Sequence, residues 1–230
     1  MGKIELPQGL ELKRDDKGLA LVGGGMELRG DFAHMLPRLR RANLHRELLV
    51  RAARIKGVAA PVVVDATAGL GEDSLLLAAA GCEVTLCERD AVIAALLRDA
   101  LERAADNPNL SEAVGRMRLI EGDSIHTLRS LEQTPDVVFL DPMFPEKRKR
   151  AATNKKLQLF QQLERPCEDE DALMRAALDA HPRKVVVKRP LKGPYLAGIK
   201  PSSSLMGKVV RYDIVIPVYP YSTGLKSVPI

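Results

Sequence analysis

The chain has 230 residues, of which 46% are hydrophobic and 28% are charged, and its formal net charge is +5. This length suits one medium-sized domain with an appendage, and the hydrophobic fraction is enough for a substantial core. No apolar run approaches the roughly 18 residues that span a bilayer, and residues 1–16 lack the features of a secretory signal. The three cysteines have no CxxC spacing, so we predict neither disulfides nor a metal site, and we expect a reducing cytoplasm.

The basic residues are concentrated in three windows of the sequence. Residues 36–56, 146–156 and 183–192 contain seven, six and five of the 35 Lys and Arg residues, with only Glu47 and Glu146 as acids. The rest of the chain is acidic, with 17 cations against 28 acids. This distribution favours a polyanion as partner, nucleic acid above all. The alternative for any single window is an ordinary solvated face.

Residues 1–57 are expected to form an N-terminal extension. LELKR (10–14) and LALV (19–22) flank the turn sequence DDKG, which predicts a β-hairpin. From Pro37 to Lys56, leucines and alanines recur at roughly helical spacing with arginines between them. This pattern predicts a single basic amphipathic helix that ends at Gly57.

Residues 58–230 alternate short apolar strands with helices. We predict strands at 61–65, 83–87, 117–121, 136–141, 184–188 and 209–218, and helices at 74–80, 91–105, 125–131, 157–162 and 171–181. The alternation predicts an α/β fold with a mostly parallel sheet and helices on both faces. The last strand follows SSSLMGK without a preceding helix, so we expect it to be antiparallel.

The loop after the first of these strands is glycine-rich and runs from Asp65 to Asp73. Gly69 and Gly71 allow the backbone to pass close to a ligand, and the helix that follows offers free N–H groups. The loop lacks the third glycine of GxGxxG, and Glu72 and Asp73 stand where a pyrophosphate would lie, which disfavours a nicotinamide dinucleotide. S-adenosylmethionine, a cationic ligand with an amino-acid moiety, suits these acids better. The alternative is a purely structural turn.

Two further strand ends carry acids. Glu88 lies 23 residues after Asp65 at the tip of the second strand, where it can accept both ribose hydroxyls of a nucleoside. After the third strand, Asp123 can accept from an adenine amino group, and Ser124 is a natural helix cap. Solvated loop acids and ordinary helix starts are the alternatives.

The most specific loop is DPMFP (141–145), which follows the apolar strand VVFL. Its two prolines restrict the turn. Asp141 and the backbone carbonyl of Pro142 can accept the N–H groups of an exocyclic base amine and orient its lone pair, and Phe144 can stack on the base. A methyl sulfonium has a neutral leaving group, so positioning suffices and no metal is required. The alternative is a strand-end turn with a core phenylalanine.

Four segments resemble, in their order and spacing, the ribosomal RNA small subunit methyltransferase J family: DATAGLGEDS (65–74), CERDAVIAALLRDAL (87–101), VVFLDPMFPEKRK (137–149) and KVVVKRP (184–190). The resemblance covers about residues 60–216, and the N-terminal 60 residues match poorly. It implies a Rossmann-like class I S-adenosylmethionine-dependent methyltransferase fold. It also implies methylation of the exocyclic N2 of a guanosine near the 3′ end of 16S rRNA in the 30S subunit. The family's cofactor contacts fall on Glu72, Asp73, Glu88, Arg89, Asp123, Ser124 and Asp141.

The resemblance implies where two of the basic windows lie relative to the site. RNA phosphates are expected to contact six cations behind two of the strands: Lys147, Arg148, Lys149, Arg150, Lys188 and Arg189. The 36–56 helix could add a further phosphate track. Tyr195 is a second candidate, after Phe144, for stacking on a base.

Three alternatives remain open. The DPMFP turn also suits another planar amine, such as an adenine or a glutamine side chain. A non-catalytic RNA-binding or ribosome-assembly factor could keep the same fold, although it would not need Asp141 and Glu88 near a polyanion. A nicotinamide dehydrogenase is the third. The four histidines have no metal-ligand spacing and form no Ser-His-Asp pattern.

Overall fold

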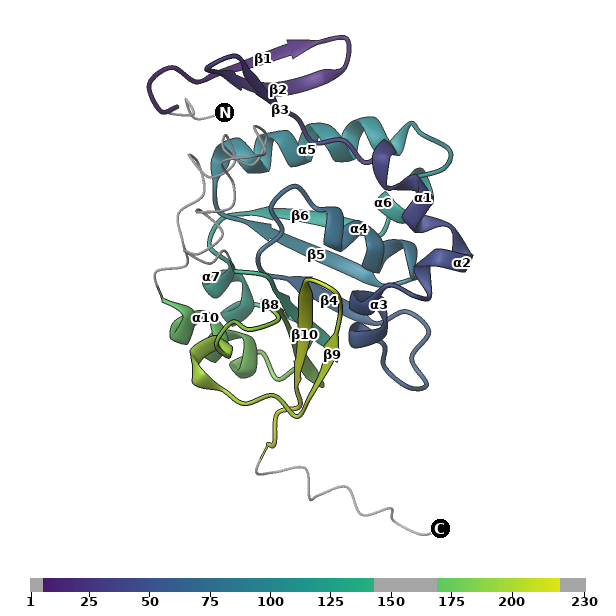
Figure 1. Cartoon of the computed structure of the whole chain (residues 1–230), viewed down its shortest axis with the longest axis vertical. Coiled ribbons are helices and arrows are strands. Elements are labelled where there is room, and N and C mark those ends of the chain that lie inside the picture. The colour runs from purple at the N-terminus through teal and green to yellow at the C-terminus, as the bar shows by residue number, and fades with distance from the viewer. Residues whose placement is uncertain (1–5, 143–168, 220–230) are drawn as a thin grey trace.

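The computed structural model describes residues 6–142 and 169–219. In these ranges the chain forms a seven-stranded mixed sheet with helices on both faces and a separate three-stranded antiparallel sheet (Figure 1). The predicted helix at 157–162 lies outside the described residues. Within them, no helix is both long and apolar enough to cross a bilayer.

The large sheet has the strand order β6-β5-β4-β7-β8-β10-β9. Its strands are β4 (Val62–Asp65), β5 (Glu83–Glu88), β6 (Met117–Glu121), β7 (Val137–Leu140), β8 (Lys184–Pro190), β9 (Ser203–Met206) and β10 (Val210–Val215). The first five are parallel to one another, and β10 is antiparallel to β8 and β9, as predicted. The strand order reverses between β4 and β7, which is where open α/β sheets bind ligands.

The central strands are continuous apolar runs because their side chains point alternately into two buried cores. Val63 and Val137 face one core, whereas Val64 and Val138 face the other, and all four are fully buried. Each buried valine contributes about 2 kcal/mol of hydrophobic free energy. A strand buried on both faces is typical of a parallel sheet covered by two helix layers.

Each core is closed by its own helices. The first core contains side chains of α3 (Leu48–Ala53), α4 (Glu72–Ala79), α5 (Ala91–Ala105) and α6 (Ser111–Val114), and the second those of α7 (Ser124–Arg129) and α10 (Glu170–Asp179). The predicted bounds of α5 are confirmed. Its start is fixed by Asp90, whose carboxylate accepts the backbone N–H groups of Val92 and Ile93 at 2.9 and 3.0 Å.

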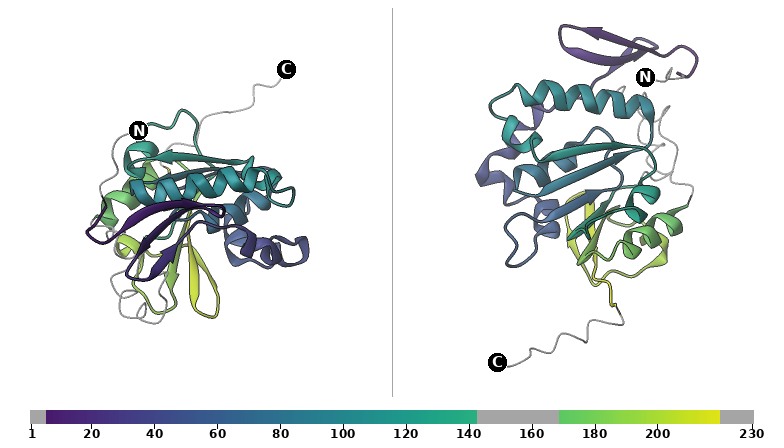
Figure 2. Two further views of the ribbon diagram at one scale, coloured as in Figure 1. Left: turned by 90° about the horizontal axis from the view of Figure 1, so that it is seen from above. Right: turned by 180° about the vertical axis from the view of Figure 1, so that it is seen from behind.

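The N-terminal sheet extends the predicted hairpin by one strand. It consists of β1 (Glu11–Asp15), β2 (Gly18–Gly23) and β3 (Met26–Leu28), all antiparallel. It lies along the outer side of α5 in both directions of view (Figures 1 and 2). Asp99 of α5 is only 2% exposed and accepts from Leu19 N at 2.9 Å and from Arg103 Nε at 2.8 Å. This buried acid therefore ties the extension to the large domain.

The prediction of one helix from Pro37 to Lys56 is wrong. The segment forms η1 (Ala33–Met35), α1 (Leu36–Leu39), α2 (Arg41–Leu44) and α3, with extended backbone at Arg40, Glu47 and Arg54. The five-residue step from Leu39 to Leu44 would place these side chains about 140° apart on a continuous helix. Breaking the helix allows Leu44 to be buried in the same core as Leu49.

Candidate functional site

Backbone hydrogen bonds bring the four predicted loops together at the carboxyl edge of the large sheet. Ala68 N donates to Cys87 O at 3.1 Å, which joins the glycine turn to the end of β5. Gly122 N donates to Glu88 O at 2.8 Å, which joins the ends of β5 and β6. Asp141 N donates to Thr67 Oγ1 at 2.6 Å, which joins the turn after β7 to the loop after β4.

The glycine turn has the conformation that its sequence requires. Gly69 and Gly71 have φ angles of 55° and 79°, in the left-handed region that favours glycine. A Cβ atom on Gly71 would stand 2.7 Å from the Leu97 side chain. The turn is thus packed tightly against α5, and α4 begins directly after it with Glu72 and Asp73 in its first turn.

Glu88 holds the glycine turn in place. Its carboxylate accepts from Gly69 N at 2.9 Å and from Asp90 N at 2.8 Å, and the residue is 7% exposed. Burial raises its pKa above the ordinary value for glutamate, against the opposing effect of the two backbone donors.

Asp65 lies beneath the turn. It is 1% exposed, and its two oxygens accept from the Ser74 hydroxyl at 2.6 Å and from Thr67 N at 3.1 Å. Burial raises the pKa of Asp65 to about 7. These contacts indicate that Asp65 supports the loop from below.

The third loop differs from the prediction in which residue caps the helix. Asp123, not Ser124, is the N-cap of α7, and its carboxylate accepts from Ile125 N at 3.0 Å. Ser124 is the first residue of the helix itself. Asp123 is exposed, as are Glu72 and Arg89.

Lys188 lies inside the site. Its Nζ donates to Asp73 Oδ2 at 2.6 Å and lies 3.0 Å from Asp141 Oδ2. Burial disfavours its charge, but the carboxylates of Asp141 and Asp73 outweigh burial and raise the pKa of Lys188 above the ordinary lysine value. The sequence analysis predicted only an RNA contact for Lys188, because a strand pattern does not show which acids a lysine contacts.

Arg189 is not on the rim. Its side chain is fully buried, its Nε donates to Pro194 O at 2.8 Å, and Glu170 lies 3.6 Å from it. The expectation of a surface cation at this position is therefore wrong. The burial of Arg189 could have been predicted from the alternation of side chains along β8, since Arg189 shares a strand face with Val185 and Val187, which are core residues.

The remaining predicted residues divide into two groups. Pro142 is buried at the end of β7. Five predicted residues lie outside the described ranges: Phe144, Lys147, Arg148, Lys149 and Arg150.

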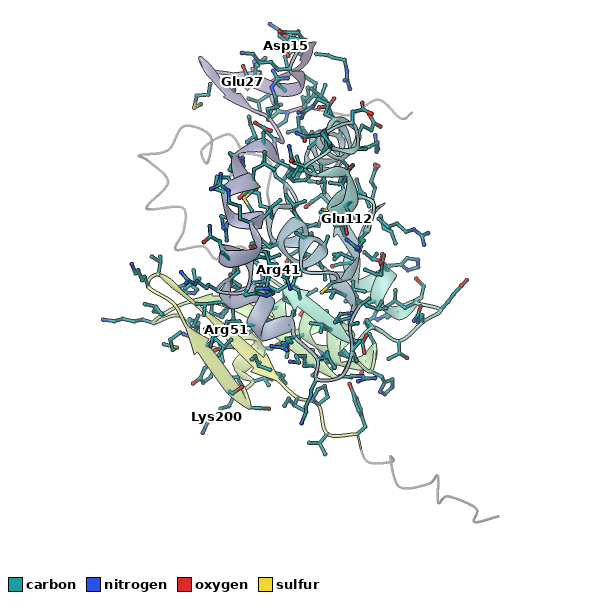
Figure 3. All side chains as sticks on the ribbon, turned by 90° about the vertical axis from the view of Figure 1, so that its right-hand side faces the viewer. Asp15, Glu27, Arg41, Arg51, Glu112 and Lys200 are labelled. Carbon is teal, nitrogen blue, oxygen red and sulfur yellow. The ribbon has the colours of Figure 1, made fainter. Side chains whose placement is uncertain are left out.

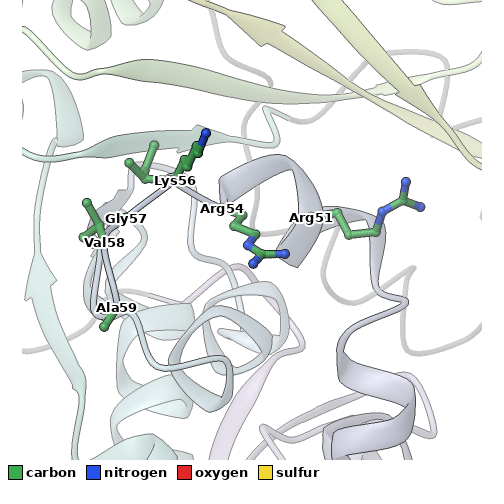
Figure 4. A pocket seen from close by; sticks show the side chains of 7 residues that line it. Arg51, Arg54, Lys56, Gly57, Val58 and Ala59 are labelled. Atoms are coloured by element: carbon green, nitrogen blue, oxygen red, sulfur yellow. The ribbon is translucent and has the colours of Figure 1, made fainter.

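A basic face runs along the helices before β4. Arg38 pairs with Glu47 at 2.8 Å. No described carboxylate lies within ion-pair distance of the other cations of this face: Arg40, Arg41, Arg46, Arg51, Arg54 and Lys56. Arg41 and Arg51 lie on the same side of the molecule (Figure 3). Arg51, Arg54 and Lys56 line an open hollow in the surface (Figure 4).

Comparison with known proteins identifies the family. A family model described as "Putative SAM-dependent methyltransferase" matches residues 7–217. The "Ribosomal RNA small subunit methyltransferase J" of Thioalkalivibrio sulfidiphilus is 46% identical over 178 residues, which are 76% of this chain and 70% of that protein. The chain belongs to the ribosomal RNA small subunit methyltransferase J family.

Other members of the methyltransferase J family agree with this assignment. The Aeromonas salmonicida protein is 47% identical over 73% of this chain and 68% of its own length, and a Pseudomonas aeruginosa protein is 47% identical over 73% and 65%. A crystal structure of a SAM-dependent methyltransferase from Neisseria gonorrhoeae matches with a TM-score of 0.75 and 32% identity over 97% of this chain and 89% of that one. The family model begins at residue 7, whereas the alignments with the methyltransferase J relatives cover about three quarters of this chain.

S-adenosylmethionine is the cofactor that this family implies, and the site suits it. The described part of the carboxyl edge gathers the acids Asp65, Asp73, Glu88, Asp123 and Asp141, with Lys188 between two of them. An acidic site favours a cationic sulfonium and ammonium over a pyrophosphate. Glu88 lies at the tip of β5, Asp73 follows the glycine turn, and Asp123 follows β6. These residues are the ones that would hold the cofactor.

Proposed function

We propose that this protein transfers a methyl group from S-adenosylmethionine to the exocyclic N2 of a guanosine near the 3′ end of 16S rRNA in the small ribosomal subunit. The observation that carries the proposal is the position of Asp141-Pro142. This turn ends β7 beside the strand-order reversal and is fixed by the 2.6 Å hydrogen bond from Asp141 N to Thr67 Oγ1. The names of the methyltransferase J relatives support the ribosomal RNA as substrate.

The cofactor, when bound, supplies an electrophilic methyl group on a positively charged sulfur. Asp141 and the carbonyl of Pro142 accept the two N–H groups of the guanine amine and turn its lone pair toward that methyl group. The nitrogen forms the new N–C bond as the C–S bond breaks, the bonding pair remains on sulfur, and the nitrogen then loses one proton to water. Positioning is the main task of the chain, because the leaving group is a neutral thioether.

A methyltransferase for another planar amine, such as adenine or glutamine, would use the same turn. The relatives' ribosomal RNA name favours a nucleobase over a protein side chain. A non-catalytic RNA-binding factor is disfavoured by the acids that the carboxyl edge retains, since Asp73, Glu88 and Asp141 would repel RNA phosphates without serving binding.

The basic face is the proposed RNA-binding surface. It extends from Arg38 on α1, which contacts α4 beside the glycine turn, to Arg54, whose carbonyl accepts from Lys184 at the amino end of β8. The face thus spans the sheet from the site edge to the opposite edge, about 20 Å for strands of this length. Because the proposed substrate is ribosomal RNA, we propose that the protein acts in the cytoplasm.

Substitution of Asp141 tests the proposed role of the turn. We expect Asp141→Ala to lower methyl transfer to 16S rRNA by about 100-fold or more, because the amine loses an acceptor in the transition state. Cofactor affinity, measured by calorimetry, should fall only modestly. Exposed Asp16→Asn serves as the control variant. Turnover near the wild-type rate in Asp141→Ala would refute the role assigned to this carboxylate.

A further inference from the structure

One ammonium group joins the two functional loops of the site. Lys188 Nζ contacts Asp73 at 2.6 Å, on the loop proposed to hold the cofactor, and Asp141 at 3.0 Å, on the turn proposed to hold the target amine. These acids come from different elements, the first turn of α4 and the end of β7. Two carboxylates that share one ammonium lie close enough to repel each other strongly once the ammonium is removed.

We propose that Lys188 is a positioning residue for methyl transfer, which fixes one oxygen of Asp141 and holds the Asp73 loop beside the Asp141 turn. The part of this proposal that concerns the rate rests on the proposed function. The structural part concerns Lys188 and the two acids alone.

A second lysine of the same strand provides a contrast with Lys188. Lys184 lies four residues earlier, on the same face of β8, and its Nζ donates to the carbonyls of Ala52 and Arg54 at 3.0 and 2.9 Å. Burial lowers the pKa of Lys184, and no carboxylate of the described residues forms an ion pair with it. Of these two lysines, the one at the carboxyl edge is paired with acids and the one at the amino edge with neutral carbonyls.

Among the described groups around Lys188, Asp73 and Asp141 are its main electrostatic partners. Tyr212 lies directly opposite it on β10, and burial and the charge of Asp73 raise the pKa of this phenol to about 12, so it is neutral. Arg38 directs its guanidinium to Glu47 at 2.8 Å. Among the described residues, Asp65 and Arg189 also lie within electrostatic range of Asp141, and each makes hydrogen bonds of its own.

The contact geometry explains how Lys188 acts on the reaction. The attacking nitrogen gains positive charge during transfer, and an ionised Asp141 stabilises that charge. Because Lys188 binds Oδ2 of Asp141, it restricts rotation of the carboxylate and so fixes the direction of its other oxygen. The same ammonium group restrains Asp73, and it therefore keeps the Asp73 loop and the Asp141 turn next to each other.

The experiment compares Lys188→Met and Lys188→Arg with Lys184→Met as the matched control. Protein labelled with ¹³C at aspartate carboxyls reports by NMR the environment of Asp73 and Asp141, with resonances assigned through the Asp73→Asn and Asp141→Asn variants. Calorimetry gives the affinity for S-adenosylmethionine, and transfer to 16S rRNA gives kcat and KM.

For Lys188→Met we expect the carboxyl resonances of Asp73 and Asp141 to move from their wild-type positions, because both carboxylates lose the ammonium group that they contact. The expected kcat is about 100-fold lower, with KM for RNA and cofactor affinity within about fivefold. Lys188→Arg should keep these resonances near their wild-type positions and lose less rate. Lys184→Met should lower stability without moving these resonances.

Unchanged Asp73 and Asp141 resonances in Lys188→Met, or a kcat within about threefold of wild type, would overturn the proposal. If Lys188→Met does not fold, the charge-balanced double variant Asp73→Asn/Lys188→Met replaces it. Its kcat should lie at least about tenfold below that of Asp73→Asn alone, and equal values would overturn the proposal. If the wild type methylates no guanosine, the proposed function fails, while the NMR comparison still decides whether Lys188 holds the two acids.

Discussion

Asp65 and Glu88 end adjacent strands, and both are buried acids that serve the glycine turn. Asp65 accepts from Ser74 and Thr67 below the turn, whereas Glu88 accepts from Gly69 within it. The sequence predicted that both would bind a nucleoside cofactor, because strand-end acids commonly do so. The sequence could not show that Asp65 supports the loop from below while Glu88 lies within the turn, because this difference depends on where the fold places each side chain.

The raised pKa of Asp65 makes folding stability depend on pH. The folded chain keeps this carboxyl protonated up to about pH 7, whereas an unfolded aspartate ionises near 4. Between these values the folded state binds more protons, so this group's contribution to the free energy of unfolding falls as pH rises from about 4 to about 7.

Replacement of Asp65 by asparagine tests this contribution. The free energy of unfolding of Asp65→Asn, relative to wild type, should rise between pH 5 and pH 8 in urea denaturation, because the amide cannot ionise. Asp16→Asn, at an exposed turn position, is the comparison variant. A stability difference that stays constant over this range would contradict the account.

At the scale of elements, prediction succeeded where one residue pattern determined the outcome. The strands VVVD and VVFL are apolar on both faces, and α5 carries a capping Asp90 before a regular apolar stripe, so their positions followed from sequence. The sequence analysis did not predict β9, because Ser203 and Ser204 give no strand signal and the pairing of this strand depends on β10. The prediction of one helix in the 36–56 window was wrong because packing of this segment against the core overrode its approximate helical spacing.

At the scale of the whole molecule, charge is divided between the site and the surface beside it. The carboxyl edge is acidic and suits a cationic cofactor, whereas the helices from Arg38 to Arg54 present cations to solvent (Figure 3). The basic composition of residues 36–56 was visible in the sequence. That Arg189 would be buried, so that the RNA-binding surface does not include it, required the fold.

Charge reversal on the basic face tests its role in RNA binding. The double variant Arg51→Glu/Arg54→Glu should weaken binding to 16S rRNA and make the slope of log affinity against log salt shallower by about one to two units, because fewer counterions are released. Cofactor affinity should not change. Arg175→Glu on α10, which packs on the opposite face of the sheet, is the control and should bind RNA as the wild type does. Equal salt slopes in all three proteins would place the RNA elsewhere.

The most direct test of the central claim is transfer of tritium from labelled S-adenosylmethionine to 30S subunits that lack native methylation, followed by nucleoside analysis. The account predicts label in N2-methylguanosine from 16S rRNA. Label in another nucleoside would retain the methyl-transfer chemistry and contradict the target. The absence of label on 30S subunits and on free 16S rRNA, with cofactor binding intact, would contradict the claim that this site methylates ribosomal RNA.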